Sequence, residues 1–300
     1  MKTFRFVRAL CFFLVVESAL VLPELAALGG GDKDGHGGVS GRTESSGGRP
    51  ERIVSLSPGV TEILYALGAD RELVGVTDYC NYPPQVSEKT RVGGFSGATV
   101  SVETIAALRP DLVIVSGEMH GRVVELLDGL GIRSLAVEPE NFSEVYDTIR
   151  LLGTLTGHGE SAQDLIDTMR EKIERAALRR QGREVLTVFW ELWDNPLLTA
   201  GGPTLISEAI TLAGGRNIFA ELGQRWPEVS YEEVLRRRPQ WILSADDHRL
   251  DAALLSRRPS WSRIPAVEAG RIASVNADMI SRYGPRLADA VLLIAETLYP

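Results

Sequence analysis

The two halves of this chain repeat one sequence pattern, and this repetition limits the fold more than any other feature. The first half reads SVETI at 101–105 and RPDLVI at 109–114, and the second half reads SYEEV at 230–234 and RPQWIL at 238–243. Each copy predicts a short helix capped by serine, a stop at Arg-Pro and a buried strand. A second match, YALG at 65–68 and TLAG at 211–214, precedes the first in both halves. Two matches in the same order indicate two similar lobes.

A long amphipathic helix is predicted between the two halves. Its apolar side chains recur every three or four residues, at Ala162, Leu165, Ile166, Met169, Ile173, Ala176 and Ala177. This spacing is typical of one apolar helix face, and a helix of ~20 residues spans about 30 Å. We therefore expect a rigid helix at 158–181 that bridges an N-terminal lobe, 51–157, and a C-terminal lobe, 182–300, with a ligand cleft between the lobes.

Both lobes alternate predicted strands and helices, which indicates an α/β fold with mostly parallel sheets covered on both faces. The expected strands are 53–56, 73–76, 112–115, 134–137, 185–190, 241–244 and 272–275. The expected helices, besides the bridging one, are 58–67, 102–108, 122–130, 143–156, 203–212, 231–237, 250–255 and 286–299.

The N-terminal 50 residues are predicted to serve export rather than the fold. Lys2, Arg5 and Arg8 precede a mostly apolar stretch at 10–22, so residues 1–28 are predicted to be an export signal, either cleaved or kept as an anchor. Residues 29–50 are rich in Gly and Ser and are predicted to be a flexible linker. The expected location is the periplasm or the outer face of the cytoplasmic membrane.

Composition and missing motifs exclude several classes of protein. The net charge of −8 argues against nucleic acid or an anionic membrane surface as the main partner. Cys11 lies in the apolar N-terminal stretch, so Cys80 has no predicted disulfide partner and no cysteine-based metal site can form. No phosphate-binding glycine loop, zinc-protease motif or nucleophile elbow is present. We therefore expect neither catalysis nor a resident cofactor or metal.

Aromatic residues are concentrated in the loops that follow the predicted strands. Loops run over the surface, and ligands of open α/β sheets bind beyond the carboxyl ends of strands. Such side chains suit a large, flat, partly apolar ligand, although each could instead close the end of its own lobe. The predicted ligand-binding residues are Tyr79, Tyr82, Phe95, Trp193, Trp226, Asp278, Arg282 and Tyr283.

One histidine and two glutamates have further predicted roles. His120 follows a strand and could be an axial ligand to a metal in a macrocycle, but an ordinary surface histidine is the favoured interpretation. Glu103 and Glu232 occupy equivalent places in the two lobes, one residue before the position that a capping box uses. A pair of equivalent acids suits a symmetric, basic receptor.

Four segments resemble one family of proteins. These are RIVSLSPGVTE at 52–62, TDYCNYPP at 77–84, RPDL at 109–112 and WPEVS at 226–230. They resemble the substrate-binding proteins of ABC importers, in particular the periplasmic cobalamin-binding proteins and their relatives for haem and ferric siderophores. The resemblance covers residues 51–300. It implies two Rossmann-like lobes bridged by one long helix, and a monomer that captures a corrinoid.

The resemblance also implies roles for single residues. Tyr79, Phe95 and Trp226 would contact the corrinoid, and residues 278–282 would form a polar edge of the cleft. Glu103 and Glu232 would dock onto arginines of the permease dimer in the membrane. Phe95 stands where the cobalamin binders usually have Trp, which leaves haem or a ferric siderophore as alternative ligands. An enzyme acting on a tetrapyrrole, such as a chelatase using Glu118 and His120, is the alternative of another class.

Overall fold

The computed structural model describes residues 48–300, so the predicted export signal and residues 29–47 of the linker lie outside the described residues. The described chain forms two compact units. The N-terminal unit contains residues 48–170 and Arg282–Pro285, and the C-terminal unit contains Glu171–Ser281 and Arg286–Pro300. None of the helices within residues 48–300 is both long and apolar enough to cross a membrane.

The N-terminal unit is built on a five-stranded sheet in which every neighbouring pair is parallel. Its strand order is β3-β2-β1-β4-β5. The strands are β1 (Ile53–Ser55), β2 (Leu73–Val76), β3 (Thr90–Arg91), β4 (Leu112–Val115) and β5 (Ser134–Ala136). β1 and β4 are buried along their whole length, as expected for central strands of a covered parallel sheet.

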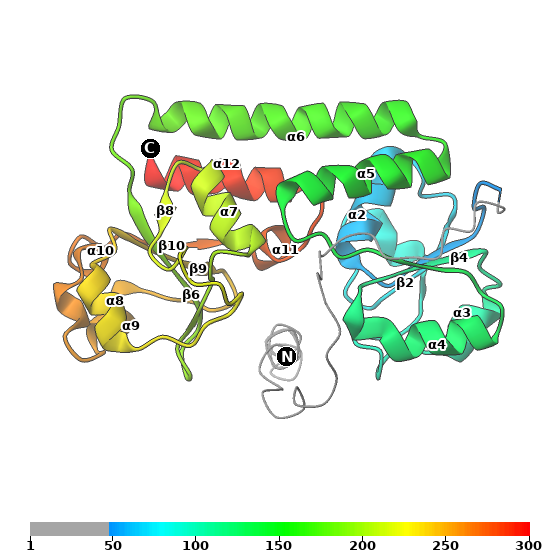
Figure 1. Ribbon diagram of the computed structural model, residues 1–300, viewed down its shortest axis with the longest axis horizontal. Helices are drawn as coiled ribbons and strands as arrows, with labels where there is room; N and C mark the ends of the chain where they lie inside the picture. Colours follow the sequence, from blue (N-terminus) through cyan, green and yellow to red (C-terminus); the bar gives the residue numbers. More distant parts are fainter. Residues whose placement is uncertain (1–47) are drawn as a thin grey trace, which may run out of the picture. The chain divides into compact units, whose positions relative to one another are not determined.

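Helices cover both faces of this sheet (Figure 1). The α-helices are α2 (Pro58–Leu67), α3 (Val102–Ala107), α4 (Gly121–Gly129) and α5 (Phe142–Thr156), and short 3-10 turns lie at η1 (Pro84–Glu88) and η2 (Glu118–His120). α2 packs against α5 on one face, and α3 packs near α4 on the other. A core of buried side chains from β1, β4, α3 and α4 includes Val54, Val113, Ile105 and Leu127.

The C-terminal unit repeats this parallel arrangement and adds one antiparallel strand, β7. Its sheet has the order β10-β9-β6-β7, with β8 paired to β6. The strands are β6 (Thr187–Trp193), β7 (Leu198–Thr199), β8 (Arg216–Asn217), β9 (Trp241–Ala245) and β10 (Ile272–Val275). All pairs are parallel except β6 with β7, which is antiparallel. Three strands were not expected from the sequence, and each is only two residues long: β3, β7 and β8.

The helices of the C-terminal unit also lie on both faces of its sheet (Figure 1). They are α7 (Leu205–Leu212), α8 (Tyr231–Arg237), α9 (Ala252–Ser256), η3 (Trp261–Arg263), α10 (Pro265–Glu268), α11 (Ala277–Ile280) and α12 (Leu287–Leu298). α12 packs on α7, while η3 packs with α8, α9 and α10. The core on that second side is centred on Phe189, Phe219 and Trp261, which meet edge to face.

The repeat predicted from the sequence is present in the backbone. Ser101 and Ser230 cap α3 and α8, and each hydroxyl accepts a hydrogen bond of 3.1 Å from the amide three residues later. Both helices then reach an arginine in the left-handed region, Arg109 at φ 47° and Arg238 at φ 48°. A proline and a buried strand follow in each unit, which confirms that the two units are built alike.

The long predicted helix is α6 (Gly159–Arg180), drawn as one uninterrupted green helix in Figure 1. The boundary between the two units falls within it, after Arg170. Ala162, Ile166, Met169 and Ala176 of the predicted stripe are buried, whereas Ala177 is exposed. Arg282–Pro285 is a second place where the chain passes between units, and the sequence pattern did not reveal it.

One strand boundary differs from the prediction with consequences for the site. The predicted strand 185–190 is β6, which begins at Thr187 and continues to Trp193. Trp190 is therefore a fully buried core residue, and Glu191 is a charged residue inside a strand.

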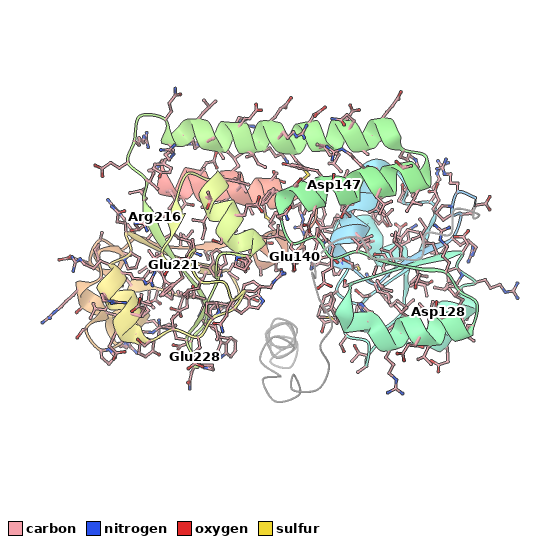
Figure 2. All side chains as sticks on the ribbon, viewed as in Figure 1. Asp128, Glu140, Asp147, Arg216, Glu221 and Glu228 are labelled. Atoms are coloured by element: carbon pink, nitrogen blue, oxygen red, sulfur yellow. The ribbon has the colours of Figure 1, made fainter. Side chains whose placement is uncertain are left out.

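Charged side chains elsewhere lie mostly on the outside of the two units. Examples that are exposed and labelled in Figure 2 are Asp128, Asp147, Arg216, Glu221 and Glu228.

Candidate functional site

In the N-terminal unit, Tyr79 lies in a loop that begins at the carboxyl end of β2. Arg91 holds this loop from β3, because its Nη1 donates to the carbonyl oxygens of Thr77 at 2.7 Å and Cys80 at 2.8 Å. The Asp78 amide also donates to the Gly93 carbonyl. Tyr79 is half-buried on this braced loop, and Tyr82 is 43% exposed. These hydrogen bonds hold the backbone of the loop that carries both tyrosines.

Phe95 belongs to the next loop and lies beside Tyr79. Their ring centroids are 6.1 Å apart in an edge-to-face arrangement. The loop turns at Gly93, whose φ of 109° disfavours other residues and where a Cβ would lie 2.3 Å from the Thr99 carbonyl oxygen. Phe95 is half-buried. The structure thus brings two of the predicted ligand-binding aromatics together at the carboxyl edge of one sheet.

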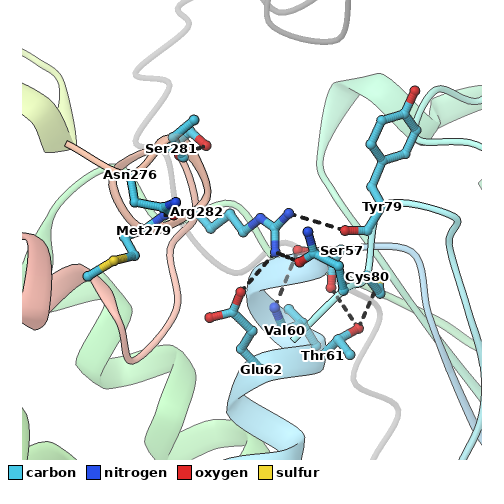
Figure 3. A network of polar contacts seen from close by, with 12 residues as sticks. Ser57, Val60, Thr61, Glu62, Tyr79, Cys80, Asn276, Met279, Ser281 and Arg282 are labelled. Carbon is cyan, nitrogen blue, oxygen red and sulfur yellow. Dashed lines mark hydrogen bonds and ion pairs between the residues drawn. The ribbon is translucent and has the colours of Figure 1, made fainter. Parts of the chain in front are cut away.

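Arg282 is bound within the N-terminal unit, as Figure 3 shows. Its Nη1 donates to Glu62 Oε1 on α2 at 3.0 Å and to Asn81 Oδ1 at 2.8 Å, and its Nη2 donates to the Tyr79 carbonyl at 3.2 Å. The Glu62 side chain is 1% exposed and that of Arg282 is 11% exposed. Arg282 therefore anchors the Tyr79 loop to α2, and its contact with ligand stays a prediction.

Tyr283 follows Arg282 into the same unit. Its hydroxyl accepts a hydrogen bond from Ser57 Oγ at 2.9 Å, donates to the Val137 carbonyl at 3.0 Å, and lies 3.0 Å from Ser116 Oγ. Burial raises the pKa of Tyr283, although the serine hydrogen bonds oppose that shift. The hydroxyl therefore ties the ends of β1, β4 and β5 together, and a ligand would meet only the ring.

Cys80 and His120 are packed groups of this unit. The Cys80 thiol is buried and lies 3.3 Å from the hydroxyls of both Thr61 and Thr77, and burial raises its pKa despite these hydrogen bonds. His120 has no exposed surface, so its predicted position at the surface is wrong. Backbone groups of Ser116 and Phe95 provide partners for both ring nitrogens, which allows the imidazole to be buried. Its Nδ1 is engaged by the backbone of Ser116, and its Nε2 lies 2.9 Å from the Phe95 carbonyl.

The surroundings of His120 give both of its ring nitrogens backbone partners. Burial lowers the pKa of His120, with the two backbone hydrogen bonds opposing the shift, and both ring nitrogens already have partners. Its ring meets Phe95 edge to face at 6.3 Å. Binding a metal would require breaking one of these contacts, so the axial-ligand role of His120 stays an untested alternative. The contact with the Phe95 carbonyl supports the loop that carries Phe95.

In the C-terminal unit, Trp193 and Trp226 lie on segments fixed by backbone hydrogen bonds. Trp193 ends β6, and its indole Nε1 donates to the Asn195 carbonyl at 2.9 Å. Residues 225–229 run beside 197–201, because the amides of Thr199 and Gly201 donate to the carbonyls of Pro227 and Arg225. Both tryptophans are half-buried. Each retains exposed aromatic surface that can contact a ligand.

Asp278 lies in the first turn of α11, directly after β10. Asn276 caps that helix by accepting a hydrogen bond from the Met279 amide at 3.2 Å. Asp246, at the end of β9, accepts hydrogen bonds from the Asn276 side chain at 3.1 Å and from the Ala277 amide at 2.9 Å. The carboxyl ends of β9 and β10 are thereby joined, and Asp278 is placed at this edge.

A buried charged network lies at the same edge, and sequence reasoning missed it. Glu191 has no exposed surface, and Arg258 binds it with both guanidinium nitrogens, at 2.5 Å from Nη1 to Oε2 and 2.7 Å from Nη2 to Oε1. His248 Nε2 lies 2.9 Å from Glu191 Oε1. Arg258 also donates to Asp194 Oδ1 at 2.8 Å, and Tyr231 donates to the same oxygen at 3.1 Å.

The network holds Glu191 ionised. Burial opposes ionisation, but the hydrogen bonds and charges of Arg258 and His248 outweigh it and keep the pKa of the Glu191 carboxyl below its usual value. The only sequence signal for the network is the single acid inside the apolar run FWELW at 189–193. The sequence around Arg258 and His248 carries no signal for the network, because Glu191 is 67 and 57 residues away from them.

Glu103 and Glu232 lie in the first turns of α3 and α8, and both are exposed. Ser101 Oγ donates to Glu103 Oε2 at 3.2 Å. Glu233, the neighbour of Glu232, instead pairs with Arg236 and Arg237. The two predicted docking acids thus occupy equivalent positions in the two units. Within the described residues, no group of three or more His, Cys, Asp or Glu side chains could hold a metal ion.

Known proteins share this architecture and sequence. Over 259 residues the chain is 33% identical to an uncharacterised ABC transporter substrate-binding lipoprotein of Bacillus subtilis, covering 84% of this chain and 81% of that one. It is 32% identical over 252 residues to a vitamin B12-binding protein of Pectobacterium carotovorum, covering 83% and 88% of the two chains. A periplasmic haem-binding protein from Roseiflexus sp. RS-1 superposes with a TM-score of 0.73 at 25% identity, covering 84% and 98%.

The family assignment rests on most of the folded chain. A model of the periplasmic binding protein family matches residues 53–279, which include both sheets. The predicted α/β fold with two similar lobes agrees with this match and with the structure. The chelatase alternative fails, because members of this family are transport binding proteins. The chain therefore belongs to the periplasmic binding protein family and is a binding protein of ABC import, not an enzyme.

Proposed function

We propose that this protein captures a corrinoid of the cobalamin type outside the cytoplasm and delivers it to an ABC importer. The observation that carries the proposal is the set of half-exposed aromatics at the strand ends, Tyr79 and Phe95 in one unit and Trp193 and Trp226 in the other. Such rings suit the faces and edges of a large macrocycle. The similarity to vitamin B12-binding proteins supports cobalamin as the ligand.

Haem is the second candidate, and the likeness to a haem-binding protein favours it. Aromatic side chains can stack on either macrocycle, so their presence alone does not distinguish a cobalamin site from a haem site. Phe95 is smaller than Trp, but a phenyl ring retains the ability to stack. A ferric siderophore is the remaining alternative within the same class of transport.

Delivery is proposed to use Glu103 and Glu232. Both acids are exposed, and each lies two residues after the serine that caps its helix. Equivalent acids on two similar units match the two halves of a permease dimer that carries basic residues. Such exposed pairs would set the orientation and rate of docking more than its affinity.

Purification followed by calorimetry tests the ligand. The described part of the chain, 48–300, would be titrated with cobalamin, ferric haem and a ferric siderophore, and absorbance spectra would record the bound species. We expect cobalamin to bind most tightly and to be released unchanged on denaturation. Tighter binding of haem or siderophore would replace cobalamin as the ligand while leaving the transport class in place.

A further inference from the structure

Contacts within the C-terminal unit hold the Trp193 side chain in one orientation. Its ring stacks with the imidazole of His248, at an interplanar angle of 22° and with the centroids 6.2 Å apart. Its indole Nε1 donates to the Asn195 carbonyl at 2.9 Å. The next residue along the chain, Asp194, accepts a hydrogen bond from Arg258 at 2.8 Å. The plane of this predicted ligand-binding ring is therefore set by its neighbours.

The imidazole of His248 is itself held by Glu191. Its Nε2 lies 2.9 Å from Glu191 Oε1, and its side chain is 17% exposed. Glu191 is ionised in its paired contact with Arg258, so its oxygens only accept hydrogen bonds. Nε2 therefore carries a proton in the neutral imidazole and in the charged imidazole alike. The contact with Glu191 fixes the ring of His248 in either protonation state.

The backbone on both sides of His248 is also confined. The His248 amide donates to the carbonyl of Ala245, the last residue of β9, at 3.1 Å. The following residue, Arg249, has a φ of 51°, in the left-handed region that favours glycine. Such a conformation costs free energy and persists where the surrounding structure holds it. The turn therefore places His248 beside Trp193 at the carboxyl edge of the sheet, where ligands of such sheets bind.

Stability alone does not account for the charged pair beneath His248. The Glu191 side chain has no exposure, and that of Arg258 is 8% exposed. A buried ion pair can often be replaced by apolar side chains of similar volume without loss of stability. An apolar side chain could not accept the hydrogen bond from Nε2, so it could not orient the imidazole. Orientation of His248 is what this pair provides beyond packing.

We infer that His248 is a positioning residue for ligand binding, which holds the Trp193 indole in the plane that receives the ligand. Glu191 and Arg258 fix the imidazole and act through it. The inference rests on the proposed function, in which Trp193 contacts a flat macrocycle. A ring that is already fixed loses little conformational freedom when the ligand binds, so more of its contact energy is retained as affinity.

A double-mutant cycle separates positioning from direct contact with the ligand. Cobalamin is titrated calorimetrically into the parent, His248→Gln, Trp193→Ala and the double variant. Glutamine can still donate to Glu191 but has no ring. We expect His248→Gln to weaken binding about tenfold and Trp193→Ala about ten- to one hundredfold. Once Trp193 is alanine, His248→Gln should cost less than about twofold, because no indole is left to position.

Two further variants complete the binding series. His248→Phe restores a ring beside Trp193 and should bind cobalamin within about threefold of the parent. His158→Gln is the matched control, at a half-buried histidine of the N-terminal unit whose Nδ1 lies 3.2 Å from Thr156 Oγ1. It should bind cobalamin as the parent does. Melting temperatures establish that every variant folds.

The orientation of Trp193 is measured directly in the free protein. The chain has five tryptophans, so labelling with 5-fluorotryptophan gives five fluorine resonances, and Trp193→Phe identifies the one from Trp193. This resonance should move in His248→Gln, because the stacked imidazole is gone, and should not move in His158→Gln. A merely structural role of His248 would lower the melting temperature without this selective change.

The outcomes separate this inference from the proposed function. Parental affinity or an unmoved Trp193 resonance in His248→Gln would overturn the inference and leave the function standing, as would an equal loss of affinity with and without the indole. A parent that binds haem or a siderophore in place of cobalamin would overturn the proposed ligand, and the same cycle with that ligand would then test the inference. A parent that binds none of the three would overturn both.

Discussion

Arg282 Nη1 lies 3.0 Å from Glu62 Oε1, which joins two residues 220 positions apart inside the N-terminal unit. The glutamate side chain is almost fully buried in α2, and the arginine also binds Asn81 and the Tyr79 carbonyl. A buried carboxylate that loses its cation is left uncompensated, and this costs far more than a surface pair. The pair therefore couples the stability of the N-terminal unit to the position of a predicted ligand-binding loop.

Arg282→Met should lower the free energy of unfolding of the N-terminal unit by about 3–5 kcal/mol, the range for breaking a buried ion pair. It should also weaken ligand binding, because the Tyr79 loop loses its anchor. Urea unfolding monitored by far-UV circular dichroism measures the change in the free energy of unfolding. Arg122→Met, at an exposed arginine of α4, should change stability by less than about 0.5 kcal/mol. Equal stability of the two variants would show that the pair contributes nothing.

Because of Glu191, we expect the stability of the C-terminal unit to decrease in acid. Folding lowers the pKa of this carboxyl, so its contribution is complete above the unfolded-state pKa and is lost as pH falls through the lower folded-state pKa. Unfolding free energies measured from pH 7 to pH 3 should fall more steeply in the parent than in Glu191→Gln. Glu184→Gln, at an exposed glutamate of the same unit, should follow the parent curve. A Glu191→Gln curve parallel to the parent would contradict the linkage.

Trp226→Ala should weaken binding of the preferred ligand by roughly 1–3 kcal/mol, as expected for loss of a large aromatic anchor. The indole is half-buried on a segment hydrogen-bonded to residues 199–201, so the loss should not rearrange that segment. Trp226→Phe retains a ring and should cost less than the alanine change. Calorimetry with the parent and both variants measures the difference. Unchanged affinity in Trp226→Ala would mean that the indole only closes the end of its own unit.

Glu103→Lys combined with Glu232→Lys should abolish ligand uptake while leaving ligand affinity nearly unchanged. Each acid is exposed in the first turn of a helix, so reversal should cost only about 0.3–1 kcal/mol of helix-dipole stabilisation per site. Each single change should remove part of the uptake, and the effect should depend on salt. The measurements are uptake into permease-containing vesicles and calorimetry on the free protein.

The matched control for this charge reversal is Glu125→Lys combined with Glu268→Lys. These are exposed acids, one in each unit, so the control changes net charge by the same amount at other positions. It should support uptake at the parental rate. If the Glu103 and Glu232 double variant also transports normally, the docking role is wrong. Loss of ligand affinity in that variant would instead place the two acids at the ligand.

Local patterns in the sequence were sufficient to predict most of the architecture. Ser101 and Ser230 cap their helices through amides three residues away, and the apolar repeat of 158–181 produced one continuous helix. Alternating segments predicted two parallel sheets, and the repeat predicted that the units would match. These features depend on residues close together in the chain, where dihedral preferences and side-chain spacing act directly.

Tertiary structure alone decided which polar side chains meet. Glu62 with Arg282, and Glu191 with Arg258 and His248, are joined across 57 to 220 residues, and no local pattern encodes such partners. The partners of the histidines are likewise decided by the tertiary structure. Both ring nitrogens of His120 contact backbone groups, whereas Nε2 of His248 contacts the buried carboxylate of Glu191. The reason is physical, because desolvation and pairing depend on which segments the folded chain brings together.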